Sequence, residues 1–232
     1  MKKWKSRTLK GIITGMINSV ILKKIGIIIC RLMVGIGRKR SNYIYKDKDY
    51  FRVSSLELVA YEIYHNNIEG NVAELGVFRG DFAKLINEAF PDRKLYLFDT
   101  FEGFDEKDKE AEIKRSFSKN MHDFSNTNVS LVMKKMKWKE NCVVKKGYFP
   151  ETAQGVNDKF VFVSIDADLY EPIFNGLSYF YPRLERGGYI FIHDYNDSIY
   201  IGAKEAVKKF CLENNIPYFP LSDNQGSVVI MK

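Results

Sequence analysis

The stretch VAELGVFRG, residues 72–80, is a short apolar run that leads into a glycine-containing turn. Gly76 and Gly80 allow the backbone of such a turn to approach a ligand closely. The middle glycine of the dinucleotide-binding pattern G-x-G-x-x-G is absent, which weakens the case for a bound pyrophosphate. Glu74, at the end of the apolar run, instead suits a ligand that carries positive charge. The stretch therefore predicts a strand, a ligand-binding turn and a helix in succession.

A second acid follows at the end of the next β-like run. Asp99 lies 23 residues past Gly76, and an acid about 20 residues beyond such a turn typically accepts hydrogen bonds from ribose hydroxyls. Glu74 and Asp99 could also be a helix cap and the start of a turn. Their occurrence on consecutive strands at this spacing favours a nucleoside ligand. The ammonium and sulfonium groups of S-adenosylmethionine are cations of the kind that Glu74 would face.

Short β-like runs alternate with helical patterns over the rest of the chain. Such alternation predicts a parallel, doubly wound α/β sheet with helices on both faces. Ser54–Glu57 resembles a capping box, so we expect the first helix of this region to begin there. A turn at Asp223–Gly226 predicts a closing antiparallel hairpin. The expected strands are Asn71–Gly76, Lys94–Asp99, Cys142–Lys146, Phe160–Asp166, Tyr189–His193, Pro217–Pro220 and Ser227–Met231, and the expected helices include Asp81–Phe90, Pro172–Leu184 and Ala203–Asn214.

Positive charge is concentrated near the N-terminus. Residues 1–40 contain eleven Lys and Arg and no acid, whereas the rest of the chain contains 25 basic and 29 acidic side chains. We therefore expect a basic arm over residues 1–45 and one globular domain over residues 46–232. An acidic domain does not favour nucleic acid as a partner. The three cysteines form no C-x-x-C pair, and a reducing cytoplasm is the expected compartment.

The arm contains two apolar runs, residues 11–22 and 25–36, which Lys23 and Lys24 separate. Neither run reaches the roughly 18–20 uncharged residues of a membrane-spanning helix. A cleaved signal peptide is one interpretation, although no small-residue cleavage site follows the first run. A basic amphipathic helix on the inner face of an anionic membrane is the second. The third is a pair of helices that pack on the main domain or on another subunit of a homo-oligomer.

Five motifs occur in order, within a similarity that covers about residues 54–232 and excludes the arm. They are Glu74–Gly80, Tyr96–Gly103, Lys146–Thr152, Ser164–Glu171 and Gly187–Tyr195. Together they resemble the macrocin O-methyltransferase (TylF-like) family of class I S-adenosylmethionine-dependent methyltransferases.

The resemblance implies a Rossmann-like fold with a seven-stranded, mostly parallel sheet and a C-terminal antiparallel hairpin. It implies S-adenosylmethionine as methyl donor and, as acceptor, a hydroxyl of a nucleotide-linked or lipid-linked sugar for a surface polysaccharide or a glycosylated natural product. An O-methyltransferase for another small acceptor, such as a phenol, is the alternative, and a non-catalytic binding protein is another. The residues expected to hold the methyl donor are Glu74, Gly76, Phe78, Gly80, Asp99, Thr100, Gly147, Tyr148 and Asp166.

The resemblance also implies a metal site. Characterised relatives use a divalent cation, typically magnesium, held by the first Asp of a D-x-D motif and two adjacent acids after the fifth strand. The corresponding residues here are Asp166, His193 and Asp194. Magnesium prefers oxygen ligands and imidazole suits softer metals, so His193 is expected to be a metal ligand, a base or a substrate contact. We expect all three at one sheet edge, with Asp166 as ligand and base and Asp194 as ligand.

Several nearby residues have two interpretations each. Asp168 either lines the site or caps the helix that follows it. Tyr170 and Tyr195 either line the sugar pocket or pack in the core. The lysine-rich stretch Met133–Lys139 is more typical of a solvated helix face than of a phosphate site. The long polar segment Asp105–Asn128 is expected to form a lid.

Overall fold

The computed structural model describes residues 9–20, 22–25, 49–118 and 121–232. The chain divides into two compact units, residues 1–40 and 41–232. In the first unit, helix α1 (Leu9–Val20) precedes a 3₁₀ turn at Leu22–Ile25. The remainder of the second apolar run and the predicted boundary at residue 45 lie outside the described residues. Within the described ranges, no helix combines the length and the apolar character that crossing a membrane requires.

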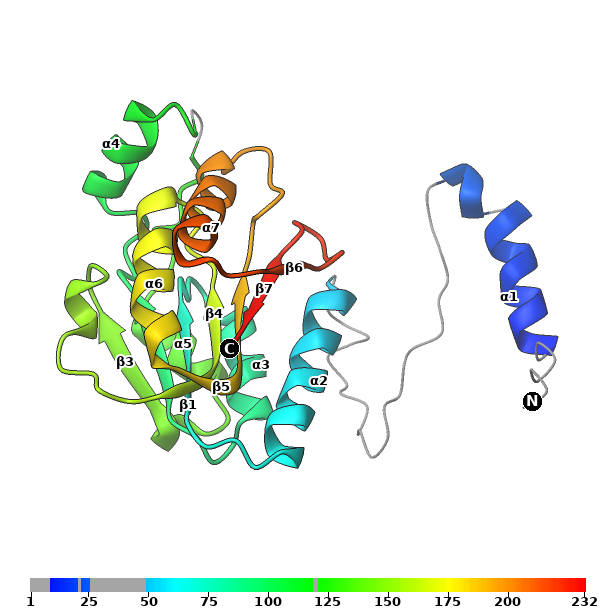
Figure 1. Ribbon diagram of the computed structural model, residues 1–232, viewed down its shortest axis with the longest axis horizontal. Coiled ribbons are helices and arrows are strands. Elements are labelled where there is room, and N and C mark those ends of the chain that lie inside the picture. Colours follow the sequence, from blue (N-terminus) through cyan, green and yellow to red (C-terminus); the bar gives the residue numbers. More distant parts are fainter. Residues whose placement is uncertain (1–8, 21, 26–48, 119–120) are drawn as a thin grey trace. The chain divides into compact units, whose positions relative to one another are not determined.

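The described part of the second unit contains one sheet of seven strands, in the order β3-β2-β1-β4-β5-β7-β6 (Figure 1). Strands β1 to β5 run parallel, β7 runs antiparallel to β5, and β6 runs antiparallel to β7. The strand order reverses between β1 and β4, where α/β sheets typically bind ligands. The strands are β1 (Asn71–Leu75), β2 (Leu95–Asp99), β3 (Cys142–Lys146), β4 (Phe160–Ile165), β5 (Leu184–Ile192), β6 (Phe219–Pro220) and β7 (Val228–Met231).

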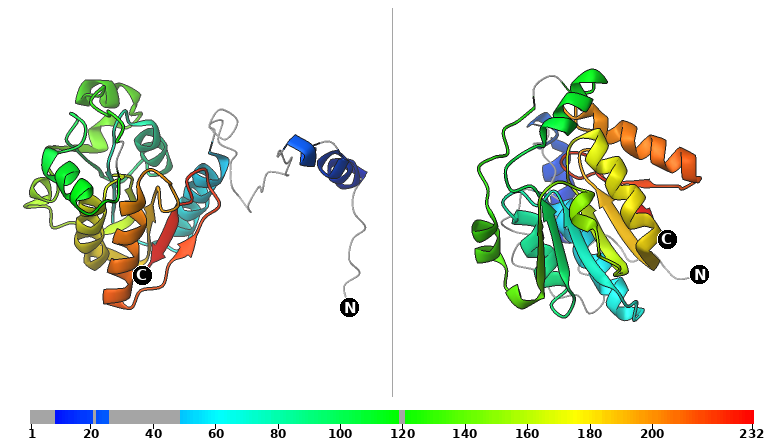
Figure 2. Two further views of the ribbon diagram at one scale, coloured as in Figure 1. Left: turned by 90° about the horizontal axis from the view of Figure 1, so that it is seen from above. Right: turned by 90° about the vertical axis from the view of Figure 1, so that its left-hand side faces the viewer.

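Helices cover both faces of the sheet (Figure 2), which confirms the predicted fold class. Helices α6 and α7 bury one face, and α2, α3 and α5 bury the other. Helix α4 lies near one end of α6. The helices are α2 (Tyr50–His65), α3 (Asp81–Ala89), α4 (Glu106–Lys114), α5 (Val129–Lys135), α6 (Tyr170–Arg183) and α7 (Ile201–Asn214).

The alternation of side chains along β1 determines which residues face the site. Ala73 and Leu75 join the core under α6 and α7, whereas Val72 joins the core under α2 and α3. Successive side chains of a strand point to opposite faces. Glu74 therefore points towards the layer that contains α2.

Two predicted element starts differ from the structure by four residues or more. Helix α2 begins at Tyr50 and not at Ser54, because Asp49 is the N-cap and accepts the backbone N–H of Arg52 at 3.1 Å. Strand β5 begins at Leu184 and not at Tyr189, since its first residues already pair with the start of β4. Gly187 and Gly188 thus lie within the strand, although the sequence pattern favours a turn at this position.

Candidate active site

A cavity of about 380 Å³ opens at the carboxyl ends of β1, β2, β4 and β5. Its lining comes from segments that are far apart in the sequence, including the turn after β1, the segment before α4 and the loops after β4 and β5. It contains every predicted site residue except Gly80: Glu74, Gly76, Phe78, Asp99, Thr100, Gly147, Tyr148, Asp166, His193 and Asp194.

Asp99 fixes the turn after β1. One carboxylate oxygen accepts the backbone N–H groups of Val77 and Phe78, both at 2.7 Å, and the other accepts that of Phe101 at 2.5 Å. Charge-assisted hydrogen bonds of this kind hold a backbone firmly. Asp99 therefore couples the end of β2 to the glycine turn, a structural role in addition to the predicted contact with ribose.

Three residues of the cavity wall have the left-handed backbone conformation that non-glycine residues rarely adopt. They are Phe78, Asp168 and Asp194, with φ of 47°, 58° and 58°. Such a conformation costs of the order of 1–3 kcal/mol and is concentrated at functional sites. Its occurrence after β1, β4 and β5 marks this edge of the sheet as the site.

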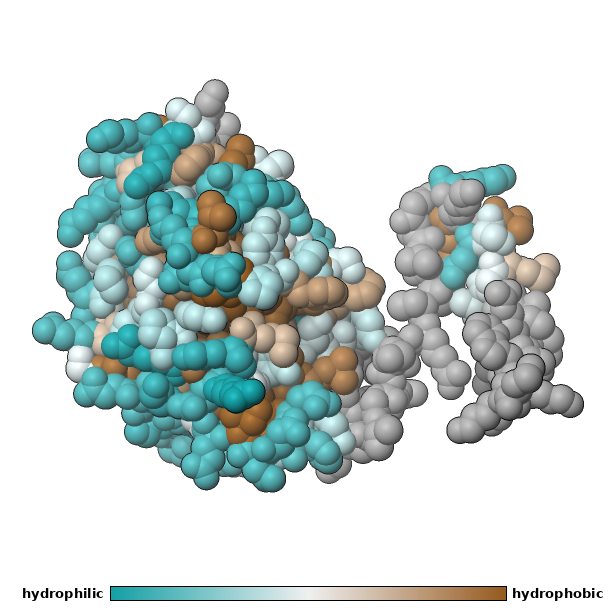
Figure 3. Space-filling model, viewed as in Figure 1, coloured by the Kyte–Doolittle hydropathy of each residue, from teal (hydrophilic) through white to brown (hydrophobic). Residues whose placement is uncertain are grey.

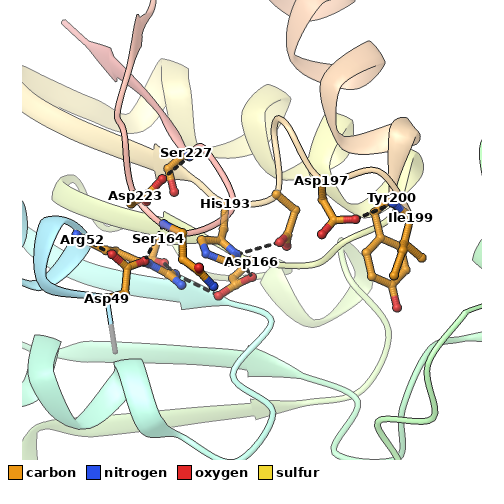
Figure 4. Close-up of polar contacts among 12 residues, drawn as sticks. Asp49, Arg52, Ser164, Asp166, His193, Asp197, Ile199, Tyr200, Asp223 and Ser227 are labelled. Atoms are coloured by element: carbon orange, nitrogen blue, oxygen red, sulfur yellow. Dashed lines mark hydrogen bonds and ion pairs between the residues drawn. The ribbon is translucent and has the colours of Figure 1, made fainter. Parts of the chain in front are cut away.

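Asp166, His193 and Asp194 come together as predicted. Figure 4 shows Asp166 beside His193. His193 Nδ1 lies 3.2 Å from Asp166 Oδ1 and 2.9 Å from Asp194 Oδ1. This buried nitrogen has no well-formed hydrogen bond among the described residues. One donor atom from each of the three side chains lies within 4.8 Å of the other two, so the arrangement can hold a divalent cation.

The pKa values of the cluster reflect burial and mutual charge. Burial raises the pKa of Asp166, but His193 and Arg52 outweigh it and hold that pKa well below its usual range. Burial lowers the pKa of His193, yet the Asp166 charge raises it to about 10. Burial and the charges of neighbouring carboxylates raise the pKa of Asp168 well above its usual value. His193 and Arg52 thus stabilise the charged form of Asp166.

Arg52 is the main site residue that the sequence did not reveal. Its guanidinium, on the first turn of α2, lies 2.8 Å from Asp166 Oδ2 and 3.3 Å from Ser164 Oγ, and it stacks 3.9 Å over the Phe82 ring. Figure 4 shows Arg52 and His193 approaching Asp166 from separate elements. Arg52 lies on the same helix face as the apolar stripe of α2. This spacing is present in the sequence, but Arg52 precedes the expected start of the helix at Ser54.

Helix α4 and the residues around it contribute to the wall of the cavity. Asp105, Asp108 and Phe124, from the segment between β2 and α5, line the cavity. Asp108 accepts the Tyr148 hydroxyl at 3.0 Å, and burial raises the pKa of Asp108 to about 6. Glu112, which is 1% exposed, accepts the backbone N–H of Tyr170 at 3.0 Å at the start of α6. These contacts attach the segment to the loop after β3 and to α6.

The remaining residues singled out in the sequence differ in whether they line the cavity. Gly80 lies outside the cavity, where an added Cβ would be 2.8 Å from Val132, so it allows α3 to pack closely on α5. Asp168 lines the cavity and makes no cap, since the N-cap of α6 is Leu169. Tyr170 and Tyr195 are buried in the core and do not line the cavity. Lys135, in the lysine-rich stretch, forms an exposed ion pair with Asp81 at 2.8 Å.

Residues 48–229 match the family described as Macrocin-O-methyltransferase (TylF). The chain belongs to this family. The match covers strands β1 to β6, the start of β7 and every residue that lines the cavity, and it begins after the basic arm.

Mycinamicin III 3''-O-methyltransferase from Micromonospora griseorubida is one relative. It is 26% identical over 164 residues, which cover 62% of this chain and 62% of that protein. Among solved structures, the O-methyltransferase NovP has a TM-score of 0.62 at 21% identity, over 79% of this chain and 80% of that one. The calicheamicin methyltransferase CalS11 has a TM-score of 0.62 at 17% identity, over 78% of each chain. Both structures share the class I methyltransferase fold with this chain.

Proposed function

We propose that this chain transfers the methyl group of S-adenosylmethionine to a hydroxyl of a sugar, in a surface polysaccharide or a glycosylated natural product precursor. The observation that carries the proposal is the single cavity that joins the Glu74–Asp99 end to the Asp166–His193–Asp194 cluster. Membership of the macrocin O-methyltransferase family supports it, as does the 3''-O-methyltransferase activity in the name of the mycinamicin relative.

The cavity residues account for the requirements of methyl transfer. The bound donor supplies a methyl group activated by its sulfonium sulfur. The enzyme must align an acceptor oxygen with that methyl group and remove the hydroxyl proton. Asp166 is the proposed proton acceptor, because its carboxylate lies at the end of β4 and lines the cavity. Positions on rigid strand ends limit the movement of these groups.

Methyl-transfer assays against nucleotide-linked sugars, lipid-linked glycans and simple phenols test this function. We expect methylation of a glycan acceptor and little turnover of phenols. Turnover of phenols alone would identify the alternative O-methyltransferase. If calorimetry detects no binding of S-adenosylhomocysteine, the demethylated donor, the chain is a non-catalytic member of the fold.

Asp99→Ala is expected to weaken S-adenosylhomocysteine binding by about 1–3 kcal/mol, the cost of unmaking charge-assisted hydrogen bonds. The substitution removes the ribose partner and releases the turn at Val77 and Phe78. Isothermal titration calorimetry measures the change, and a thermal melt checks that the fold persists. An unchanged dissociation constant in a folded variant contradicts the assignment of Asp99.

We also propose that a divalent cation assists the reaction. Asp166, His193 and Asp194 would hold it, and their clustered donor atoms fit a cation. A bound cation would lower the pKa of the acceptor hydroxyl. The imidazole favours softer metals such as iron or zinc over magnesium.

His193→Asp restores the usual acidic pair of the family and is expected to shift metal preference towards magnesium. The reason is that magnesium selects carboxylate oxygen over imidazole nitrogen. Activity of the chelator-treated protein, titrated with each metal, measures the preference of wild type and variant. If turnover falls equally at every concentration of every metal, His193 is a base or a substrate contact and not a ligand.

For the arm, we propose contact with anionic lipid at the inner face of a membrane. Ile13, Met16 and Val20 of α1 recur at helical spacing and are 49%, 62% and 62% exposed, and the surrounding arm is wholly basic in its charged residues. Figure 3 shows apolar side chains at the surface of this unit. An exposed apolar stripe with basic flanks is typical of interfacial helices.

Full-length protein is expected to sediment with vesicles that contain anionic lipid, and binding should fall as salt rises. A chain that lacks residues 1–40 should lose this binding and keep its fold. Equal sedimentation of the shortened chain contradicts lipid contact by the arm. A lower melting temperature or a dissociated oligomer on deletion supports the packing interpretation instead.

A further inference from the structure

Two buried ionisable side chains, Arg52 and Glu74, line the cavity. Glu74 on β1 and Ser164 on β4 are register partners in adjacent strands and point towards the same face. The Arg52 guanidinium approaches that face from α2 and lies 3.3 Å from Ser164 Oγ. Arg52 is 8% exposed and Glu74 is 1% exposed, and both residues line the cavity.

Neither residue is fully satisfied by the protein. Arg52 Nε and Glu74 Oε2 are buried without a hydrogen-bond partner among the described residues. An unpaired polar atom costs about 1–3 kcal/mol when it is buried, so such atoms in a functional cavity indicate a missing ligand group. A ligand with an ammonium group beside Glu74 and a carboxylate beside Arg52 would satisfy both atoms with charge-assisted hydrogen bonds.

An α-amino acid in its zwitterionic form carries these two charges two bonds apart. The methyl donor of the proposed function ends in such a group, at the opposite end from its adenosine. We infer that Arg52 binds the α-carboxylate of the donor and positions its amino-acid half beside Glu74. This inference rests on the proposed function for the identity of the ligand.

Arg52 also contacts Asp166. Its Nη2 atom lies 2.8 Å from Asp166 Oδ2. One planar guanidinium can bind two carboxylates at once through separate N–H groups. Arg52 would thus fix the position of the donor relative to Asp166, the proposed proton acceptor. Lysine, with one point of charge on a flexible stem, would reproduce the charge but not this alignment.

A pair of ligands that differ in the amino-acid half tests the inference. S-adenosylhomocysteine contains it, whereas 5'-deoxy-5'-methylthioadenosine has the same nucleoside and thioether without it. By calorimetry, Arg52→Gln should weaken the binding of S-adenosylhomocysteine by about 10- to 100-fold, because the variant loses a charged hydrogen bond. The second ligand should bind within about twofold of wild type, because it has no carboxylate to lose.

Arg79→Gln is the matched control. Arg79 also lines the cavity, but its side chain is exposed on the turn after β1. It should leave the affinity for both ligands nearly unchanged. The inference is overturned if Arg79→Gln, and not Arg52→Gln, selectively weakens the binding of S-adenosylhomocysteine. An equal weakening of both ligands by Arg52→Gln does so too, because it would show that Arg52 only supports the architecture of the site.

Wild-type protein provides a measurement that does not depend on folding of a variant. Decarboxylated S-adenosylhomocysteine keeps the amino group and lacks the carboxylate, and it should bind about 10- to 100-fold more weakly than the intact ligand. Equal affinities of wild type for the two overturn the role of Arg52. Failure of wild type to bind any of these nucleosides is a different result, which rejects the proposed function itself.

Discussion

Asp166→Asn is expected to lower turnover by about 10²–10⁴-fold, the usual effect of losing a positioned base. The amide has the shape of the carboxylate and keeps an oxygen that can accept a hydrogen bond from Arg52, but it cannot take a proton from the acceptor hydroxyl. S-adenosylhomocysteine should therefore bind with nearly the affinity of wild type. The turnover number and the calorimetric dissociation constant, measured on the same preparation, separate the two effects.

Asp194→Asn is the comparison for this experiment. Asp194 shares the cluster through His193, 2.9 Å away, but we assign it only as a metal ligand. Loss of a ligand weakens metal binding, so added metal should partly restore the activity of this variant. Added metal should not restore Asp166→Asn. If Asp166→Asn is active, and wild type is fully active in chelator, both the base and the metal site are wrongly assigned.

The sequence was informative where the motifs lie on strand ends. Glu74, Asp99, Asp166, His193 and Asp194 each follow or end a buried strand, and the parallel topology brings such positions to one edge. Their convergence follows from the strand order alone. The distances between them depend on side-chain directions, which the sequence pattern does not contain.

Arg52 was missed for a definite physical reason. The pattern at Ser54–Glu57 resembles a helix start, but the cap is Asp49, whose carboxylate accepts the Arg52 N–H. The first turn of α2 therefore fell outside the expected helix. A buried arginine is rare unless it is paired, and its partner Asp166 lies 114 residues away in the sequence. The local pattern places Arg52 on the buried face of α2, but it does not identify Asp166 as its partner.

Gly80 shows the limit of reading function from a glycine. In the sequence it belongs to the same turn as Gly76, yet only Gly76 lines the cavity. Both have positive φ, 85° at Gly76 and 73° at Gly80. The left-handed backbone conformation thus explains both glycines, whereas a position in the cavity wall explains only Gly76.

Gly76→Ala is expected to destabilise the main domain by at least about 4 kcal/mol, in the range that marks severe local disruption. A Cβ at this position would lie 1.9 Å from the backbone carbonyl oxygen of Asp166. That contact is with backbone and not with a flexible side chain, so β1 and β4 would have to separate where Asp166 N–H donates to Leu75 at 2.8 Å. For a domain of this size, the melting temperature should fall by roughly 8–16 °C.

Gly155→Ala isolates the backbone part of this effect. Gly155 has φ of +79°, close to that of Gly76, but a Cβ there meets nothing within 4 Å. The Gly155→Ala variant should be destabilised only by the cost of placing alanine in a left-handed conformation, about 1–2 kcal/mol. Differential scanning calorimetry of both variants measures the difference, which is the steric term. If the two variants melt together, the close approach of Gly76 to the loop after β4 does not constrain the fold, and Asp166 is free to move relative to the glycine turn.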